Sequence, residues 1–417
     1  MNKSQSSTIL LLCFCTIALH SHAQEFDTFF VDKTLRVDYI FSGDTDSQTI
    51  AVDEMSVLPR WYGKRTRLAE VPVEGNGQIV VRHHDTQQVI YRNSFSTLFQ
   101  EWLSYDEAKT TKKAFENVFL IPMPKATVDI TVDLRNNRRE VMASFRHTID
   151  PADILIREKG THAITPFETI QQAEDTTRCI HIAFVAEGYT EKEMGLFISD
   201  AQAATDAIFA HEPFKSHRNR FNIIAVKAPS QDSGTSHQAQ HIWKKTALDS
   251  NFNTFYSDRY LTTLHLKKLH DWLAGTPYEH IIVLVNTTHY GGGGILNSYN
   301  LAMAHHPQFK PVVVHEFGHS FAGLADEYAY ESEDIPMYPH DIEPWEPNIT
   351  TLTHFEDKWK EMVGTASGIG LYEGAGYSMK GVYRPADDCR MRTNGNPEFC
   401  KVCQKAITRL IDFYTQP

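Results

Sequence analysis

The stretch HEFGH at residues 315–319 constrains this chain more than any other feature of its sequence. On an α-helix, positions i and i+4 lie on one face, so the imidazoles of His315 and His319 can reach one metal ion. Glu316 lies one position further round, where its carboxylate can contact a water on that metal without being a ligand. The neighbouring apolar residues fall on a separate stripe: Val314, Phe317, Phe321 and Leu324. The segment therefore predicts a helix with one face for the core and another for a metal.

The residues after this helix offer a third ligand, which a catalytic zinc site needs beside its open position. Gly323 is a natural helix stop, and Asp326 and Glu327 come soon after it. The spacing is HExxHxxxGxxD, one residue longer than the metzincin type HExxHxxGxxD, whose ligand position is taken here by Ala325. We expect one catalytic Zn²⁺ with Asp326 as the third ligand and Glu327 as the alternative.

The composition excludes several classes of protein. The chain has 417 residues, of which 41% are hydrophobic and 22% charged, so it can bury at least one large core. Its 40 basic and 52 acidic residues give a net charge of −12, which argues against nucleic acid as a partner. Beyond the N-terminus, no apolar run is long enough to span a bilayer, so we expect no membrane span.

Residues 1–23 have the features of a signal peptide. Lys3 is followed by a short apolar stretch, residues 9–19, and Ser21-His22-Ala23 fits the small-x-small rule for cleavage after Ala23. We therefore expect the mature protein to be exported, as a periplasmic or extracellular protein.

Four cysteines lie outside the signal peptide, and three of them fall close together near the C-terminus. In an exported protein, a local disulfide from Cys389 to Cys400 or Cys403 is the favoured interpretation. A structural zinc site that uses the Cys400-x-x-Cys403 pair is the alternative.

The chain divides into two regions by pattern. Residues 24–155 predict a β-sandwich-like domain, with a hairpin from 128–134 to 141–145 and one helical stretch near 99–116. No motif in this region carries chemistry. In residues 160–417, apolar strands at 180–186, 221–226 and 281–285 alternate with helices, which predicts an α/β domain.

Two of the helices in the second region can be predicted from specific residues. A capping box of Thr190 and Glu193 opens the first, which we expect to run through Ile208. Leucines and a tryptophan between Leu261 and Leu273 mark the second.

The chain resembles the bacterial immunoglobulin-A-specific metallopeptidases, a family with a zincin fold. The resemblance covers about 160–417 and rests on five segments: HEFGHSFAGLADEY, AEGYT at 186–190, SQDSGTS at 230–236, YGGGG at 290–294, and DCRMRTNGNPEFCKVC at 388–403. The β-rich front is similar to the domain commonly attached to these peptidases. The expected fold class is thus an α/β (α+β) zincin-like catalytic domain preceded by an all-β sandwich-like N-terminal domain.

The resemblance also implies roles for residues. It places zinc on His315, His319 and Asp326, with Glu316 as the catalytic acid and base. Sites of this kind have a methionine-containing turn beneath the metal, for which Met391 is the candidate, held by the local disulfide; Met379 is the rival.

Other candidates are weaker. Glycines at 291–294 allow close backbone approach, and an edge strand there would bind an extended peptide by β-augmentation; a flexible loop is the alternative. Tyr377 and Tyr383 are candidate oxyanion donors or packing residues. His305 and His306 have no ligand spacing. The serines at 230, 233 and 236 lack a G-x-S-x-G elbow, so they predict a loop and not serine hydrolysis.

Together these features predict an exported zinc endopeptidase that cleaves protein or peptide substrates, with immunoglobulin A as the substrate that the family name implies. A second hypothesis is a catalytically inert surface protein that binds glycan or protein through its β-domain, against which the intact Glu316 argues. A third is a zinc hydrolase that acts on another bond, such as a cell-wall amide.

Overall fold

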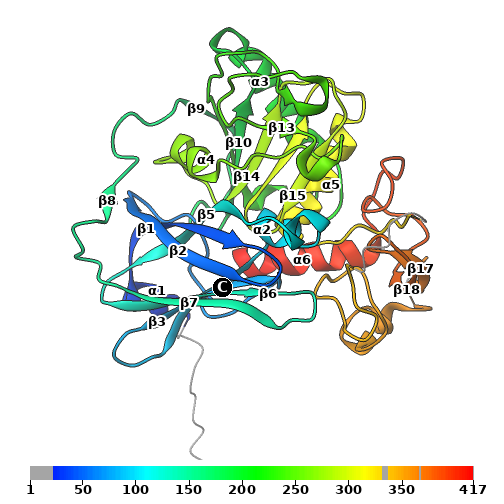
Figure 1. Ribbon diagram of the computed structural model, residues 1–417, viewed down its shortest axis with the longest axis horizontal. Coiled ribbons are helices and arrows are strands. Elements are labelled where there is room, and N and C mark those ends of the chain that lie inside the picture. Colours follow the sequence, from blue (N-terminus) through cyan, green and yellow to red (C-terminus); the bar gives the residue numbers. More distant parts are fainter. Residues whose placement is uncertain (1–21, 331–336, 366–367, 417) are drawn as a thin grey trace, which may run out of the picture.

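Two four-stranded sheets face each other in the N-terminal domain of the computed structural model, which describes residues 22–330, 337–365 and 368–416. One sheet has the order β5-β1-β2-β8. Its strands are β5 (Lys113–Pro124), β1 (Phe30–Gly43), β2 (Gln48–Leu58) and β8 (Arg157–Glu158). The other sheet has the order β4-β3-β6-β7, with β4 (Val89–Phe95), β3 (Gly77–His83), β6 (Val128–Arg135) and β7 (Val141–Ile149). The predicted β-rich front is confirmed, and Figure 1 shows it in blue to cyan.

The hairpin predicted in this domain is confirmed, because β6 and β7 pair antiparallel from Val128 opposite Ile149 onward. The helix predicted near 99–116 is wrong in its extent. α2 (Leu98–Trp102) is a single short helix, a 3₁₀ turn covers Asp106–Lys109, and β5 begins at Lys113. Phe115 lies opposite Phe41 of β1, so pairing along the sheet overrides the local helical pattern.

A six-stranded sheet forms the centre of the second domain, in the order β15-β16-β14-β10-β11-β9. The inner strands are parallel: β10 (Ile180–Glu187), β11 (Phe221–Val226), β14 (His280–Val285) and β16 (Tyr299–Met303). The outer strands β15 (Gly292–Ile295) and β9 (Phe167–Gln171) run antiparallel to their neighbours. The three apolar strands predicted from the sequence are therefore present, and every residue of β10 and β14 is buried.

Both faces of this sheet are covered, which is why its inner strands are continuously apolar. On β10, Ala183 and Val185 pack in the same core as the N-terminal sandwich. Ile182 and Phe184 point to the other face, where helices cover the sheet: α3 (Met194–Ile208), α5 (Phe309–Ala322) and α6 (Lys401–Thr415). The N-terminal domain thus packs against one face of the sheet of the second domain, and α6, red in Figure 1, reaches the N-terminal domain where Phe413 lies beside Lys64.

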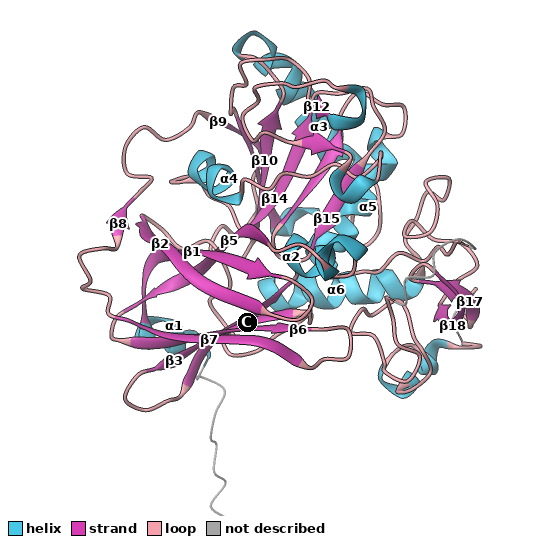
Figure 2. Cartoon of the chain, in the orientation of Figure 1, coloured by secondary structure: helices cyan, strands magenta, loops and turns pink. Residues whose placement is uncertain are grey.

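The second domain corrects one predicted boundary. The Thr190–Glu193 capping box is present and leads into α3 as expected. α4 covers only Leu266–Leu273, because Leu261 lies in an extended segment beside Gly292. Short strands β12 (Ser236–His237) and β13 (Asn251–Phe252) pair in this region, and Figure 2 shows how much of it is loop.

The C-terminal third adds a hairpin of β17 (Tyr372–Ala375) and β18 (Ser378–Arg384) before α6. At the other end of the chain, the first helix is α1 (His22–Phe29), and the predicted signal peptide lies, up to residue 21, outside the described residues. Among the helices of the described part of the chain, none combines the length and the apolar character that crossing a membrane requires.

Candidate metal centre and active-site cleft

α5 carries the HEFGH motif between the sheet and the cleft. It follows β16, and its apolar stripe packs into the core on the helical face of the sheet, where Val314, Phe317 and Phe321 are at most 1% exposed. The helix ends at Gly323, whose left-handed φ of 59° allows its N–H to bond back to the carbonyl of His319. This stop turns the chain so that the following residues come back beside the motif.

Three side chains converge where the chain turns back. Nε2 of His315 and Nε2 of His319 lie 3.0 Å apart. Oδ1 of Asp326 lies 3.0 Å from the first nitrogen and 3.3 Å from the second. We call His315, His319 and Asp326 the metal triad, since their ligand atoms are close enough together to share one metal ion.

The hydrogen bonds of the two imidazoles decide what their Nε2 atoms can do. Nδ1 of His315 lies 3.0 Å from the carbonyl oxygen of Arg390, and Nδ1 of His319 lies 2.5 Å from that of Leu324. A carbonyl only accepts, so both Nδ1 atoms donate, and in neutral imidazoles both Nε2 atoms carry lone pairs. Oδ1 of Asp326 is buried and makes no hydrogen bond among the described residues. The lone pairs of the two Nε2 atoms and of Oδ1 of Asp326 therefore face one point.

The triad fits a zinc ion. With bonds of about 2.0–2.1 Å and near-tetrahedral angles, zinc ligands lie about 3.0–3.4 Å apart, as these three atoms do. Burial lowers the pKa of His319, but the nearby carboxylate of Asp326 outweighs that effect and raises the pKa to about 9. Burial likewise disfavours the charge on Asp326, and the two imidazoles nevertheless hold its pKa well below the usual value. A metal would thus compete with a proton for this site.

Glu316 lies in the cleft beside the triad, next to the glycine strand. A Cβ placed on Gly292 would lie 2.7 Å from Oε1 of Glu316, and one on Gly294 would lie 2.5 Å from its carbonyl oxygen. The close contact with the backbone of Glu316 requires a glycine at position 294, in line with the close backbone approach predicted for the glycine run. Burial raises the pKa of Glu316, which suits a group that takes up and returns a proton.

The glycine strand lies at the edge of the sheet, as the β-augmentation interpretation requires, and part of that edge contacts neighbouring segments. β15 is the outer strand of the sheet, so the flexible-loop alternative is wrong. However, the N–H of Gly292 donates to the carbonyl of Arg259, and its carbonyl accepts from Leu261. Further along, the carbonyl of Leu296 accepts from the N–H of Ser96. Neighbouring segments thus cover the edge at Gly292 and Leu296, and β-augmentation along the part of the strand between them stays a prediction.

Met391 lies beneath α5. It is fully buried, and a Cβ on Gly318 would come within 2.7 Å of its sulfur. Its carbonyl accepts from the N–H of Glu327, and its neighbour Arg390 provides the carbonyl that orients His315. The rival Met379 is 45% exposed on β18.

A cleft of about 770 Å³ opens in front of the triad and is lined by both domains. The N-terminal domain contributes Glu101 of α2, whose carboxylate accepts a 2.5 Å hydrogen bond from the hydroxyl of Tyr260. Burial raises the pKa of Glu101 to about 7. Glu101 could not be singled out from the sequence, because it lies in a region without motifs. The N-terminal domain nevertheless contributes this carboxyl group to the lining of the cleft.

Of the two candidate tyrosines, Tyr377 contacts the metal triad and Tyr383 does not line the cleft. The hydroxyl of Tyr377 donates to Oδ2 of Asp326 at 2.5 Å, so it orients a residue of the triad. Tyr383 is outside the lining of the cleft and pairs through its backbone with Thr350. His305 bonds to Asp200, away from the triad, and the hydroxyl of Ser230 accepts hydrogen bonds from the backbone N–H groups of Gly188 and Ala247.

Glu327 points away from the triad, toward cysteines. All four described cysteines are free thiols, so the structure does not show the predicted disulfide. Glu327 instead forms a second group of potential metal ligands with Cys389, Cys400 and Cys403, which we call the thiol cluster. Burial raises the pKa of Glu327 well above its usual value. A third group joins His237 and His289 to Asp258, whose side chain is 66% exposed.

Comparison with known protein families agrees with this geometry. Residues 169–369 and 364–411 match the model described as IgA Peptidase M64, and residues 25–146 match the one described as Peptidase M64 N-terminus. The chain belongs to the IgA peptidase M64 family. No curated protein matches it.

Membership of the M64 family makes this protein a metallopeptidase, and hence an enzyme that acts on proteins or peptides. The HEFGH helix, the segment to Glu327 and the tail with the cysteines all fall inside the matched ranges. The described residues include groups that can hold the metal that such an enzyme needs.

Proposed function

We propose that this protein is an exported zinc endopeptidase with a zincin-like catalytic domain, in which His315, His319 and Asp326 hold the catalytic ion and Glu316 is the general base. The observation that carries the proposal is the convergence of three lone pairs, from Nε2, Nε2 and Oδ1, on one point of an open cleft. Two nitrogens and one oxygen are the donor set of catalytic zinc sites that keep a position open.

A zinc ion bound there would polarise the scissile carbonyl and lower the pKa of a water molecule. Glu316 would take a proton from that water and deliver it to the nitrogen of the leaving amine. Its raised pKa, caused by burial, brings the carboxyl closer to neutral, where both transfers are easiest. Tyr377 would hold the carboxylate of Asp326 in place through its hydrogen bond to Oδ2.

The cleft supports a polypeptide as substrate. It runs between the two domains, and Arg259, Tyr328 and Tyr330 line it together with Glu101 of α2. Aromatic and polar groups on both walls suit an extended peptide segment. Immunoglobulin A is the substrate that the family description suggests, and the export expected from residues 1–23 would bring the enzyme to it.

The test measures zinc content and cleavage together, in the mature protein and its Glu316→Gln variant. We expect zinc in both proteins and cleavage of immunoglobulin A or an unfolded protein substrate by the parent alone, because the amide cannot accept the proton. Zinc in both with no cleavage of any protein, but release of fragments from cell wall, would replace the peptidase by an amidase. Absence of zinc from the triad in both would overturn the ligand assignment.

A further inference from the structure

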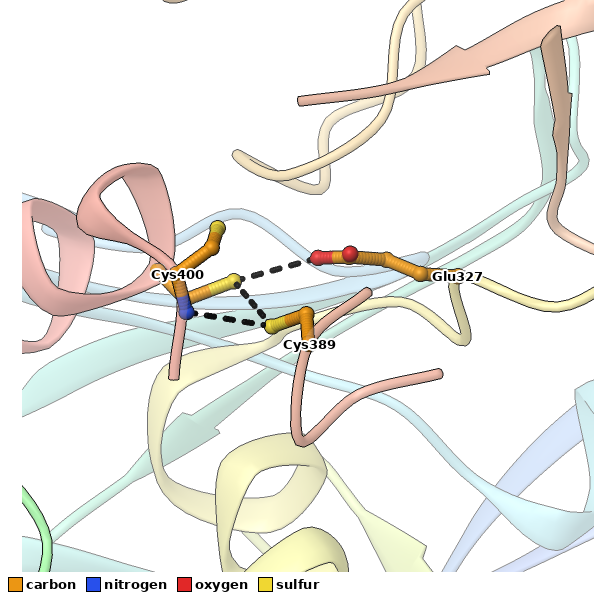
Figure 3. A group of neighbouring side chains, drawn as sticks. Glu327, Cys389 and Cys400 are labelled. Atoms are coloured by element: carbon orange, nitrogen blue, oxygen red, sulfur yellow. Dashed lines mark hydrogen bonds between the residues drawn. The ribbon is translucent and has the colours of Figure 1, made fainter. Parts of the chain in front are cut away.

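Three thiols and a carboxylate meet in the interior, beneath the segment that carries Asp326. Figure 3 shows Glu327, Cys389 and Cys400 grouped together, although they come from separate segments of the chain. Sγ of Cys389 lies 3.8 Å from Sγ of Cys403, and Sγ of Cys403 lies 3.2 Å from Oε1 of Glu327. One ligand atom from each of the four residues lies within 4.8 Å of the others.

These distances fit a tetrahedral metal site. Zinc–sulfur bonds of about 2.3 Å at tetrahedral angles place two sulfurs about 3.8 Å apart, the separation of Cys389 and Cys403. Three thiolates and one carboxylate make a closed, four-coordinate donor set, which is typical of structural zinc. A disulfide would use only two of these residues, and would leave the third thiol and the carboxylate buried without a partner of opposite charge.

A second observation independently points to a cation here. Glu327 is fully buried, and its Oε2 has no hydrogen-bond partner among the described residues. An unpaired buried carboxylate strongly destabilises the fold unless a positive charge or a proton compensates it. Its other oxygen accepts a hydrogen bond from the side-chain amide of Asn348, so the carboxylate is held in place.

The surroundings also suit thiolates. Cys400 is the N-cap of α6, and its backbone N–H donates to Sγ of Cys389 at 3.2 Å. The positive end of a helix dipole stabilises negative sulfur. Cys389 and Cys403 are both fully buried, which keeps solvent and oxidants away from the centre of the cluster.

We propose that the thiol cluster binds a second zinc ion, as a structural site distinct from the metal triad. Binding releases to solvent the protons that the three thiols and the carboxyl group of Glu327 hold, and leaves thiolates and a carboxylate on the metal, with no oxidant involved. The site stands on residues that the proposed catalytic function does not use, so either proposal can fail without the other.

Such an ion would join the segments that shape the triad. Glu327 follows the ligand Asp326 directly, and its N–H donates to the carbonyl of Met391. Cys389 precedes Arg390, whose carbonyl orients His315. Cys400 and Cys403 begin α6, so one ion would tie the third ligand and the methionine turn to a helix of the core.

The experiment is zinc analysis with X-ray absorption at the zinc edge, on the full mature chain purified under mild conditions. We expect two zinc ions per chain and a sulfur shell at about 2.3 Å. Cys400→Ser should lose most of the sulfur-bound zinc. Cys179→Ser, the matched control, should keep it, because Cys179 lies beside His181 and outside the cluster.

A thiol count on the unaltered protein keeps the test decisive if a variant fails to fold. The protein is denatured with a chelator and without reductant, and its thiols are titrated. Four thiols, from the cysteines of the mature chain, are expected; two fewer would show a disulfide and overturn the proposal. Zinc without any sulfur shell would overturn it as well. An inactive enzyme with sulfur-bound zinc would instead contradict the proposed function alone.

Discussion

Asp326 and Glu327 are neighbours in the sequence, yet their carboxylates belong to two clusters that differ in almost every respect. The metal triad has nitrogen and oxygen ligands, two of them from one helix, and borders a cleft of about 770 Å³. The thiol cluster has three sulfurs, lies in the interior and gathers ligands from separate segments. If both clusters bind zinc as proposed, the triad would keep a position open for substrate, and the thiol cluster would be closed, as is typical of structural zinc.

The difference shows how two adjacent residues can contribute to two separate sites, one proposed for catalysis and one proposed for stability. The residues after Gly323 lie outside the helix. Their consecutive carboxylates separate, because Asp326 lies with the metal triad and Glu327 with the thiol cluster. Asn348 supports this arrangement: its amide donates to Ala325 and Glu327, and its oxygen accepts from the N–H of Ala325. Changes that separate the clusters are therefore informative.

The largest effect is expected from His319→Ala, which removes a ligand of the triad only. Loss of a direct ligand should lower the cleavage rate by well over the roughly 100-fold that outer-sphere partners cost. The zinc content should fall by one ion per chain, with the sulfur shell intact. Zinc analysis and a peptidase assay measure this, with the exposed His354→Ala as the control. If both ions and full activity remained, His319 would not be a ligand.

Asn348→Ala should disturb both clusters. It removes the partner of both backbone groups of Ala325 and the amide that holds the carboxylate of Glu327, all in a buried place. We expect a loss of about 2–4 kcal/mol in the free energy of unfolding, together with weaker retention of both metals. Asn117→Ala, which removes a buried amide of the N-terminal domain, should leave both metals in place. Equal metal retention in the two variants would show that Asn348 does not couple the clusters.

Tyr377→Phe should weaken the triad and spare the thiol cluster. The change removes only the hydroxyl that donates to Oδ2 of Asp326. Partners of this kind typically contribute about 10–100-fold to metal affinity or activity. Competition with a chelator, followed at the triad and at the sulfur shell, measures the two sites separately. An equal loss at both would mean that Tyr377 acts through the fold and not through Asp326.

Part of this comparison could be predicted from the sequence. The HEFGH helix, the strand after Cys179 and the capping box of α3 follow from local periodicity, which the structure reproduces. Gly323 could be predicted as the helix stop, and Asp326 as a neighbour of the two histidines, because both residues follow the motif closely in the sequence. Met391 could be named only through the family resemblance, since a single methionine has no periodicity.

The rest depends on contacts between distant parts of the chain. Glu327 was an alternative ligand in the sequence, and only the fold shows that it faces Cys389 and Cys403 instead of the histidines. The helix expected near 99–116 ended early because β5 pairs with β1, a competition that local pattern does not show. For the same reason, nothing local places Glu101 in the cleft.

Glu101→Gln tests how Glu101 affects the cleft. This residue lines the cleft beside the metal triad and does not belong to the thiol cluster. Burial raises the pKa of Glu101 from 4.5 to about 7, so ionising it costs more in the folded protein than in the unfolded one. Wild-type stability should therefore fall as the pH rises from about 4.5 to about 7 through this group, with the full cost above that. Gln keeps an acceptor for the hydroxyl of Tyr260 but has no charge. The free energy of unfolding of the variant should match that of the wild type near pH 4.5 and exceed it by about 1–3 kcal/mol at pH 8. The sulfur shell of the zinc should be the same in both proteins. Urea unfolding at both pH values measures the difference. Parallel curves for the two proteins at all pH values would show that Glu101 ionises as freely in the cleft as in water, and that the β-domain bounds the open site without affecting its electrostatics.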